Sequence, residues 1–398
     1  MDTGDLGVYV HVPFCARVCP YCEFAVVAAR TLPPAREQAY VDALLCELER
    51  RAPAFARADA GGGGRPLASL YFGGGTPSLL TPASIGRLVA AVRAQFPPGG
   101  EVEVTLEVNP GTTERTRLPA FRAAGVNRLS IGVQSFSDAT LKRLGRAHRT
   151  AESRATLTAA RAAGFDNLSL DLITAAPGQR LADLERDLDE ALAFAPEHVS
   201  AYQLTIEPGT PFALAARRGQ LALADEEEAT QMLEQLAARL AAAGLPRYEI
   251  SSFARPGRTA RHNRRYWERR AVLAIGVGAC SYEPPSSAAP HGLRRENLRS
   301  LEAYLARIAA GAPADAGAPD VLDAASARGE AAFLSLRSAA GLDAARFRSE
   351  FGAPPRSFWP EAIDELAGAG LLSETSAGDL RLTPRGILLS NAVFACFV

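Results

Sequence analysis

The chain has 398 residues, of which 47% are hydrophobic and 22% charged, and its net charge is -1. This composition indicates a globular protein with a sizeable core, and the near-zero charge excludes a strongly basic surface for nucleic acid or anionic lipid. No apolar run is long enough for a transmembrane segment, no leader-like segment opens the sequence, and six cysteines with three clustered do not resemble a secreted disulfide framework. We therefore expect a soluble, cytoplasmic protein.

Strand-like and helical segments alternate along the first two thirds of the chain. The strands are expected at 7–14, 67–74, 102–108, 127–134, 166–173 and 198–206. The helices are expected at 34–53, 81–96, 112–123, 151–163, 181–194 and 224–243. This alternation predicts an α/β fold with a parallel sheet, curved into a full or partial TIM-type barrel.

The domain boundaries follow from composition. We expect the barrel at 1–255, a connecting segment at 256–309, and a small, mainly helical C-terminal domain at 320–398. The residues between the last two, AGAPADAGAPD (310–320), are rich in Ala, Gly and Pro and resemble a linker.

Three cysteines follow the first predicted strand within one short loop, CARVCPYCEF (15–24). Cys15, Cys19 and Cys22 could hold a [4Fe–4S] cluster and leave one iron open to a small ligand. The alternatives are a structural zinc site with His11 as fourth ligand, or three cysteines without a shared role. Zinc sites usually combine two separate cysteine knuckles, and no second knuckle is present, so the spacing favours the cluster.

Polar or glycine residues also stand at the ends of the following strands. FGGGTPS (72–78) would let the backbone approach a ligand closely. The carboxylate of Glu107, at the end of the third strand, could accept hydrogen bonds from ribose hydroxyls. The polar residues at or near these strand ends are Glu107, Gln134, Arg146 and Asp171. Each alone is an ordinary polar residue, but their register at successive strand ends predicts one binding site.

The spacing C-x3-C-x2-C, with an aromatic residue before the last cysteine, resembles the signature of radical S-adenosylmethionine (SAM) enzymes. This resemblance implies that Cys15, Cys19 and Cys22 bind a [4Fe–4S] cluster. It also implies that the amino and carboxylate groups of SAM chelate the fourth iron.

A closer resemblance extends over nearly the whole chain. YVHVPFC, FGGGTPS, LEVNPGT, IGVQSF, LGRAH, QLTIEPGTPF and LTPRGILLSNAVF are similar to motifs of the oxygen-independent coproporphyrinogen III dehydrogenases and their relatives, the HemW heme chaperones. DLITAAPGQ (171–179) departs from the common DLIYGLPGQ, which could alter the local pocket. The residues implied to contact SAM are Tyr9, Tyr21, Gly74, Gly75, Thr76, Glu107, Gln134, Arg146 and Asp171.

Two features favour the heme-chaperone branch. Phe24 stands where the dehydrogenases have a fourth cysteine, and only 14 residues precede Cys15, so coproporphyrinogen dehydrogenase activity is not expected and no catalytic residue is assigned. RHNRRYW (261–267) contains the HNxxYW motif, which implies that the connecting segment binds heme. The implied heme residues are His262, as the iron ligand, with Asn263, Tyr266 and Trp267.

The resemblance leaves two other functions open. One is oxidative decarboxylation of coproporphyrinogen III, and the other is a radical SAM reaction on a different substrate with HNxxYW as a structural motif. Cys280 replaces a histidine that is usual in HemW relatives, so the full set of heme ligands is open. The implied partners are heme and acceptor hemoproteins, with a homodimer as a possible assembly and no nucleic acid.

Overall fold

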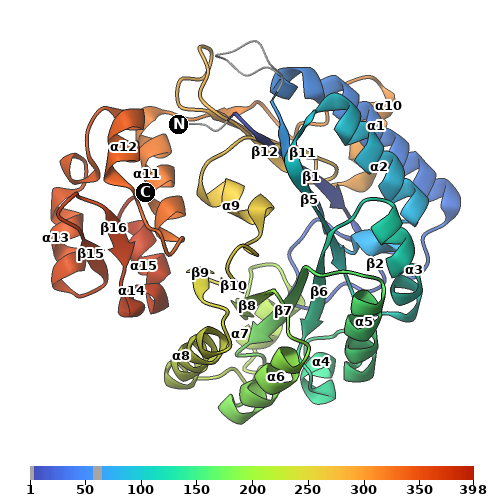
Figure 1. Cartoon of the computed structure of the whole chain (residues 1–398), viewed down its shortest axis with the longest axis horizontal. Coiled ribbons are helices and arrows are strands. Elements are labelled where there is room, and N and C mark those ends of the chain that lie inside the picture. The colour runs from blue at the N-terminus through green and yellow to red at the C-terminus, as the bar shows by residue number, and fades with distance from the viewer. Residues whose placement is uncertain (1–3, 57–64) are drawn as a thin grey trace.

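A computed structural model describes residues 4–56 and 65–398, and its largest element is a curved sheet of 12 strands (Figure 1). The strand order is β14-β13-β12-β11-β1-β4-β5-β6-β7-β8-β10-β9, and the two ends of this sheet are not paired with each other. The barrel is therefore partial. Its parallel strands are β1 (Leu6–Val12), β4 (Leu67–Gly74), β5 (Pro98–Val108), β6 (Arg128–Gln134), β7 (Leu168–Thr174), β8 (His198–Gln203) and β11 (Val272–Ile275).

The segment 256–309 adds strands to the same sheet. Strand β11 pairs in parallel with β1, from Gly7↔Val272 to Val10↔Ile275, so a late part of the chain extends the sheet beside its first strand. Short antiparallel strands complete both edges. They are β12 (Cys280–Glu283), β13 (Leu293–Glu296) and β14 (Asp320–Val321) at one edge, and β10 (Ser252–Ala254) and β9 (Arg247–Glu249) at the other.

Helices cover the convex face of the sheet (Figure 1). The helix after β4 begins where the sequence predicts, because the Thr81 side chain accepts a hydrogen bond from the Ser84 amide and Pro82 occupies the first helical position. Alternate strand residues such as Leu70 and Phe72 are fully buried in the main apolar cluster. The major outer helices are α1 (Pro34–Ala56), α2 (Pro82–Gln95), α3 (Thr112–Ala123), α5 (Thr150–Ala162), α6 (Leu181–Ala193), α8 (Glu226–Ala242) and α10 (Leu301–Ala309).

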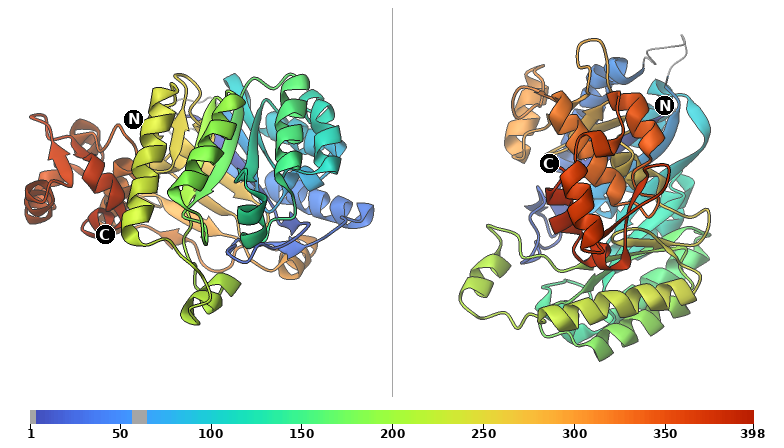
Figure 2. Two further views of the ribbon diagram at one scale, coloured as in Figure 1. Left: turned by 90° about the horizontal axis from the view of Figure 1, so that it is seen from below. Right: turned by 90° about the vertical axis from the view of Figure 1, so that its left-hand side faces the viewer.

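Shorter elements lie near the carboxyl ends of the parallel strands. Helix α7 projects from the barrel on the side of the loop that follows β1 (Figure 2, left). These elements are β2 (Phe14–Cys15), β3 (Val27–Ala28), η1 (Pro77–Leu79), α4 (Asp138–Arg143) and α7 (Pro211–Arg217). Helix α9 (Arg261–Trp267) lies apart from them, on the concave side of the sheet.

The C-terminal residues form a separate lobe with its own apolar cluster, beside α9 and α8 (Figures 1 and 2). Its Arg337 guanidinium lies over the Trp267 ring of α9, 4.5 Å from the ring centroid. Arg269, which follows α9, forms ion pairs with Glu330 and Glu350 of this lobe. The elements of the lobe are α11 (Ala324–Leu336), α12 (Ala344–Phe351), η2 (Pro355–Ser357), α13 (Pro360–Gly368), β15 (Leu372–Glu374), β16 (Leu380–Leu382), α14 (Pro384–Leu388) and α15 (Ser390–Ala395).

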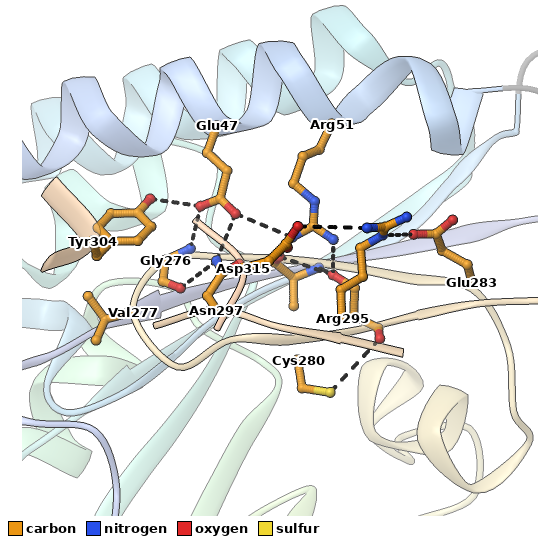
Figure 3. Close-up of polar contacts among 12 residues, drawn as sticks. Glu47, Arg51, Gly276, Val277, Cys280, Glu283, Arg295, Asn297, Tyr304 and Asp315 are labelled. Atoms are coloured by element: carbon orange, nitrogen blue, oxygen red, sulfur yellow. Dashed lines mark hydrogen bonds and ion pairs between the residues drawn. The ribbon is translucent and has the colours of Figure 1, made fainter. Parts of the chain in front are cut away.

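A buried carboxylate joins α1 to the added strands (Figure 3). Glu47, 2% exposed, accepts hydrogen bonds from Asn297 Nδ2 at 2.7 Å, the Gly276 amide at 2.9 Å and Tyr304 Oη at 2.7 Å. Arg51 lies one helical turn further and donates to the Ala274 carbonyl oxygen at 2.9 Å. Glu47 and Arg51 thus bind four residues between 274 and 304 and fix this segment against the first helix.

The α/β prediction is confirmed, and the predicted helices begin and end within three residues of the observed bounds. Apolar periodicity does not predict α9, which is only seven residues long and carries five polar residues. Within the two described ranges, no helix has the length and apolar character needed to cross a membrane.

Candidate functional site

A cavity of about 420 Å³ opens at the carboxyl ends of the parallel strands and extends into the barrel toward α9. Its wall combines the loop after β1, the ends of β4 to β8 and one residue of α9. The structure thus brings most of the predicted site residues together. Those that line the cavity are Cys15, Cys19, Tyr21, Cys22, Gly74, Gly75, Thr76, Glu107, Gln134, Arg146, Asp171 and Asn263.

The cysteine loop is held in place by its neighbours. Tyr21 packs against Phe212 of α7 with ring centroids 6.1 Å apart, and the Phe212 amide donates to the Pro20 carbonyl oxygen at 3.0 Å. Two thiols already accept hydrogen bonds, Cys15 Sγ from Thr76 Oγ1 and Cys19 Sγ from Arg146 Nη1, both at 3.6 Å.

The donor set fits an iron–sulfur cluster better than a zinc ion. Both His11 ring nitrogens have protein partners, Nε2 with the Ala25 carbonyl oxygen at 3.0 Å and Nδ1 with Tyr9 Oη at 3.2 Å, so His11 would have to give up one of these hydrogen bonds to serve as a fourth zinc ligand. In the described ranges, no three His, Cys, Asp or Glu side chains converge around a position for a single ion. A cluster spaces its thiolates more widely than one ion does.

Burial disfavours the thiolate forms of Cys15 and Cys22, so a bound metal is needed to stabilise their negative charge. It raises the pKa of the Cys15 thiol to about 11, and it also raises the pKa of Cys22. Both side chains are therefore protonated at neutral pH, even with the Arg146 guanidinium nearby. Iron would supply the positive charge that stabilises the thiolates.

The glycines after β4 are needed because other groups occupy the space around them. A Cβ on Gly74, which has φ +109°, would lie 2.5 Å from His11 Cε1. A Cβ on Gly75 would lie 2.8 Å from the Phe14 carbonyl oxygen and 3.0 Å from Cys15 Sγ. The backbone at 74 and 75 can therefore pack this closely against His11 and the start of the cysteine loop only because both residues are glycine.

Two acids line the deeper part of the cavity and have raised pKa values. Glu107 accepts hydrogen bonds from Tyr71 Oη at 2.8 Å and the Gly74 amide at 3.1 Å, and burial raises its pKa to about 7. Asp171 accepts a hydrogen bond from Ser130 Oγ at 3.1 Å, and burial raises its pKa to about 6. Both acids can therefore be protonated near neutral pH.

Asn109 is a cavity residue that the sequence prediction missed. Its Nδ2 donates to Thr76 Oγ1 at 2.6 Å, and its Oδ1 accepts a hydrogen bond from Arg146 Nη2. Arg146 in turn donates to Cys19 Sγ, so Asn109 connects two residues that contact the cysteines. Its position two residues after Glu107, in the quoted LEVNPGT, is a signal that could have identified it.

The end of β6 adopts an unusual backbone conformation beside the cavity. Gln134 has φ 64°, a left-handed conformation that is uncommon for residues other than glycine. The next residue, Ser135, is fully buried and donates to Asp187 Oδ2 at 2.8 Å. Such strained positions occur preferentially at binding and catalytic sites.

Helix α9 carries the HNxxYW motif on the inside of the sheet. Glu103 accepts hydrogen bonds from the Arg261 and His262 amides at 3.1 and 3.0 Å, which places the first turn of α9. Of the motif, only Asn263 lines the cavity. Trp267 instead faces the C-terminal lobe.

The predicted heme ligand His262 is buried, with 1% of its surface exposed. Its Nδ1 forms a hydrogen bond with Ser69 Oγ at 3.0 Å, and its Nε2 forms one with Tyr266 Oη at 3.3 Å. The ring stacks on Tyr71, with centroids 5.1 Å apart, and on Tyr9, with centroids 6.1 Å apart. Tyr9, His262 and Tyr266 therefore form an aromatic layer beneath the cavity and do not line it.

The arrangement of a partial parallel barrel around a three-cysteine loop is that of a radical SAM protein. The family model described as "Radical SAM superfamily" matches residues 9–191, and "HemN C-terminal domain" matches residues 322–389. The solved structure of coproporphyrinogen III oxidase (HemN) from Escherichia coli is 25% identical to this chain, with a TM-score of 0.81, and the match covers 99% of this chain and 90% of that one.

Curated relatives narrow the class to one family. The "Heme chaperone HemW" of Bacillus subtilis (strain 168) is 32% identical over 397 residues, which are 98% of this chain and 99% of the relative. The protein of the same name from Escherichia coli (strain K12) is 40% identical over 69% of each chain. The chain belongs to the HemW family of radical SAM proteins.

Proposed function

We propose that this protein is a heme chaperone that carries a [4Fe–4S] cluster and SAM, binds heme and passes it to acceptor hemoproteins. The observation that carries the proposal is the similarity to a heme chaperone over 98% of the chain. The cavity adds support, because cysteines, acids and amide groups predicted separately from the sequence line one space. The proposal places the protein in the cytoplasm.

The cavity residues have distinct roles in this proposal. Cys15, Cys19 and Cys22 would hold the cluster, which supplies an electron for reductive cleavage of SAM when both are bound. Arg146 and Glu107 would bind the charged and polar groups of SAM. The other proposed SAM contacts are Tyr21, Gly74, Gly75, Thr76, Gln134 and Asp171 at the cavity wall, with Tyr9 beneath it.

Heme binding would involve α9. We propose that His262 becomes the iron ligand, with Asn263, Tyr266 and Trp267 against the macrocycle. Since both His262 nitrogens have protein partners, ligation requires the ring to leave Ser69 and Tyr266. Helix α9 itself is anchored by Glu103 and by the buried Arg265, which donates to the Ala271 carbonyl oxygen, so the proposed movement is one of the His262 side chain.

The test is an anaerobic reconstitution with iron and sulfide, followed by titration with heme and measurement of the absorbance spectrum. Wild type is compared with His262→Ala and with His291→Ala, which changes a histidine outside the cavity lining. Saturable one-to-one binding that weakens only in His262→Ala supports the proposal. Absence of specific heme uptake by the wild type contradicts it.

A second function is supported by the structural similarity to HemN, including the C-terminal lobe. In this alternative, the protein decarboxylates coproporphyrinogen III oxidatively. Anaerobic, reduced protein would then form protoporphyrinogen and 5′-deoxyadenosine, whether or not His262 is present. Phe24, which is 61% exposed at the cavity where a fourth cysteine would stand, argues against this alternative.

The acceptor and the assembly are further parts of the proposal. We expect transient complexes with hemoproteins, and a homodimer is a candidate assembly. Size-exclusion chromatography with light scattering, with and without heme, measures the assembly directly. A mass that stays at 42.0 kDa under both conditions would contradict the dimer.

A further inference from the structure

The cavity is lined by a buried arginine whose side chain has no hydrogen-bond partner among the described residues. Arg128 begins β6, lines the cavity and is 2% exposed. Its guanidinium makes no hydrogen bond or ion pair with the residues of 4–56 and 65–398, and its Nε is fully buried without an acceptor. Buried charges in proteins are normally paired, and arginine cannot lose its charge as a histidine can.

The nearby carboxylates do not supply the missing partner. Glu107 is bound to Tyr71 and Gly74, and Asp171 is bound to Ser130. Burial also raises the pKa of both acids, and the charge of Arg128 is only one of the smaller influences on each. Among the described residues, the guanidinium therefore has no carboxylate in hydrogen-bonding contact.

Asn263 provides a second polar group in the same cavity, and it directly follows His262, whose pKa the charge of Arg128 helps to lower. It is the one residue of the HNxxYW motif that lines the cavity, and its amide makes no hydrogen bond within the described part of the chain. Ser200 and Tyr71 lie in the same lining. An arginine fork with an adjacent amide is a typical carboxylate-binding combination.

We propose that Arg128 and Asn263 form a carboxylate subsite in this cavity, apart from the cysteine loop. This inference rests on the proposed function, because heme carries two propionates. The carboxylate of SAM is not a candidate, since it is expected at the fourth iron beside the cysteine loop. Arg128 would form the ion pair with one propionate, and Asn263 would donate a hydrogen bond to the same group.

The experiment compares wild type with Arg128→Met, and with Arg93→Met as a control for an exposed arginine on α2. Each protein is titrated separately with heme, heme dimethyl ester and SAM. If a propionate occupies the subsite, Arg128→Met weakens heme binding about tenfold or more and leaves dimethyl ester binding unchanged. If Arg128→Met weakens SAM binding but leaves heme binding unchanged, the assignment to a propionate is overturned.

A second measurement separates this inference from the proposed function. Millimolar propionate alone should raise the melting temperature of wild type and of Arg93→Met, but not of Arg128→Met. Without any ligand, Arg128→Met should melt at the same temperature as wild type or higher, because the variant removes an unpaired buried charge.

The ligand titrations and the propionate measurement test the heme-chaperone function and the Arg128 subsite separately. A wild type that binds neither heme nor SAM contradicts the proposed function, whereas a propionate shift that depends on Arg128 would still support the subsite. If ligand affinities and the propionate shift are the same in Arg128→Met as in wild type, the subsite is overturned. If Arg128→Met does not fold, Arg128→Lys replaces it, and the expected loss of affinity is then smaller because lysine keeps the charge without the fork.

Discussion

The carboxylate of Glu103 accepts a hydrogen bond from the backbone amide of His262 at 3.0 Å, so a residue of β5 fixes the start of the HNxxYW helix. Ala260, at the N-cap of α9, has no side chain that could cap the helix. Glu103 therefore provides from a distant part of the chain what an N-cap residue provides locally.

Glu103→Ala should destabilise the protein by about 1–3 kcal/mol, because the buried His262 amide and the part-buried Arg261 amide lose their acceptor. It should also weaken heme binding, since the motif would no longer be held in one position. Urea unfolding and heme titration measure the two effects. Glu101→Ala, on the same strand with an exposed side chain, is the control and should match wild type in both.

Glu47→Ala should reduce the free energy of unfolding by about 3 kcal/mol or more. The substitution leaves the Asn297 amide, the Tyr304 hydroxyl and the Gly276 amide without their acceptor. Chemical denaturation measures the loss. Glu49→Ala, an exposed acid on the same helix, should change stability by less than about 0.5 kcal/mol, and equal losses in the two variants would refute the role of the network.

The stability of the protein should fall in acid partly because of His198. Burial holds its pKa well below the ordinary value, and its ring nitrogens contact Ser169 Oγ and Tyr248 Oη, both at 2.8 Å. The unfolded chain binds a proton at this residue below about pH 6.5, whereas the folded protein does not. Stability is therefore unaffected by this group above pH 6.5 and decreases below it, by up to ~1.4 kcal/mol per pH unit.

His198→Gln should show a shallower loss between pH 6.5 and pH 5, whatever its stability at pH 7. Urea unfolding at three pH values in this range gives the slope for each protein. Parallel slopes in wild type and variant would show that His198 is not the group responsible.

Asn109→Ala should weaken SAM binding about tenfold, or ~1.4 kcal/mol, and leave the iron content unchanged. Arg146 loses the acceptor that orients it, whereas the three cysteines remain. Iron analysis after reconstitution and isothermal titration with SAM measure the two quantities. Loss of iron together with SAM affinity would instead assign Asn109 to the cysteine loop.

The parts of the site that sequence reasoning predicted are those with a local signal. The cysteine spacing, the glycine run and polar residues at strand ends each depend on a few consecutive positions, and Cys15, Gly74 and Glu107 line one cavity as predicted. The curvature of the sheet depends on how β11 returns to β1, a contact between residues more than 260 positions apart. No local pattern determines that pairing.

The burial of His262 shows a different limit of sequence reasoning. The sequence around His262, with its arginines and aromatic residues, is typical of an exposed ligand site. The ring is nevertheless buried in the barrel, because it bonds to Ser69 and stacks on Tyr71 while Glu103 binds the backbone amide of His262. Arg128 was missed for a related reason. It lies at the start of a strand, where sequence alone does not show that the folded barrel leaves it only 2% exposed.

The crowding around Gly73, Gly74 and Gly75 also determines how this segment can vary. A side chain on Gly73 would collide with the Tyr71 and Tyr9 rings, one on Gly74 with the His11 ring, and one on Gly75 with the cysteine loop. A saturation mutagenesis screen would find three adjacent intolerant positions. Compensating second substitutions would differ at each position. A variant at 73 would need smaller residues at both 9 and 71, and a smaller residue at 11 would relieve only the steric part of the problem at 74, where the positive φ remains. At 75 the obstacles are mainly backbone oxygens, which no substitution elsewhere removes.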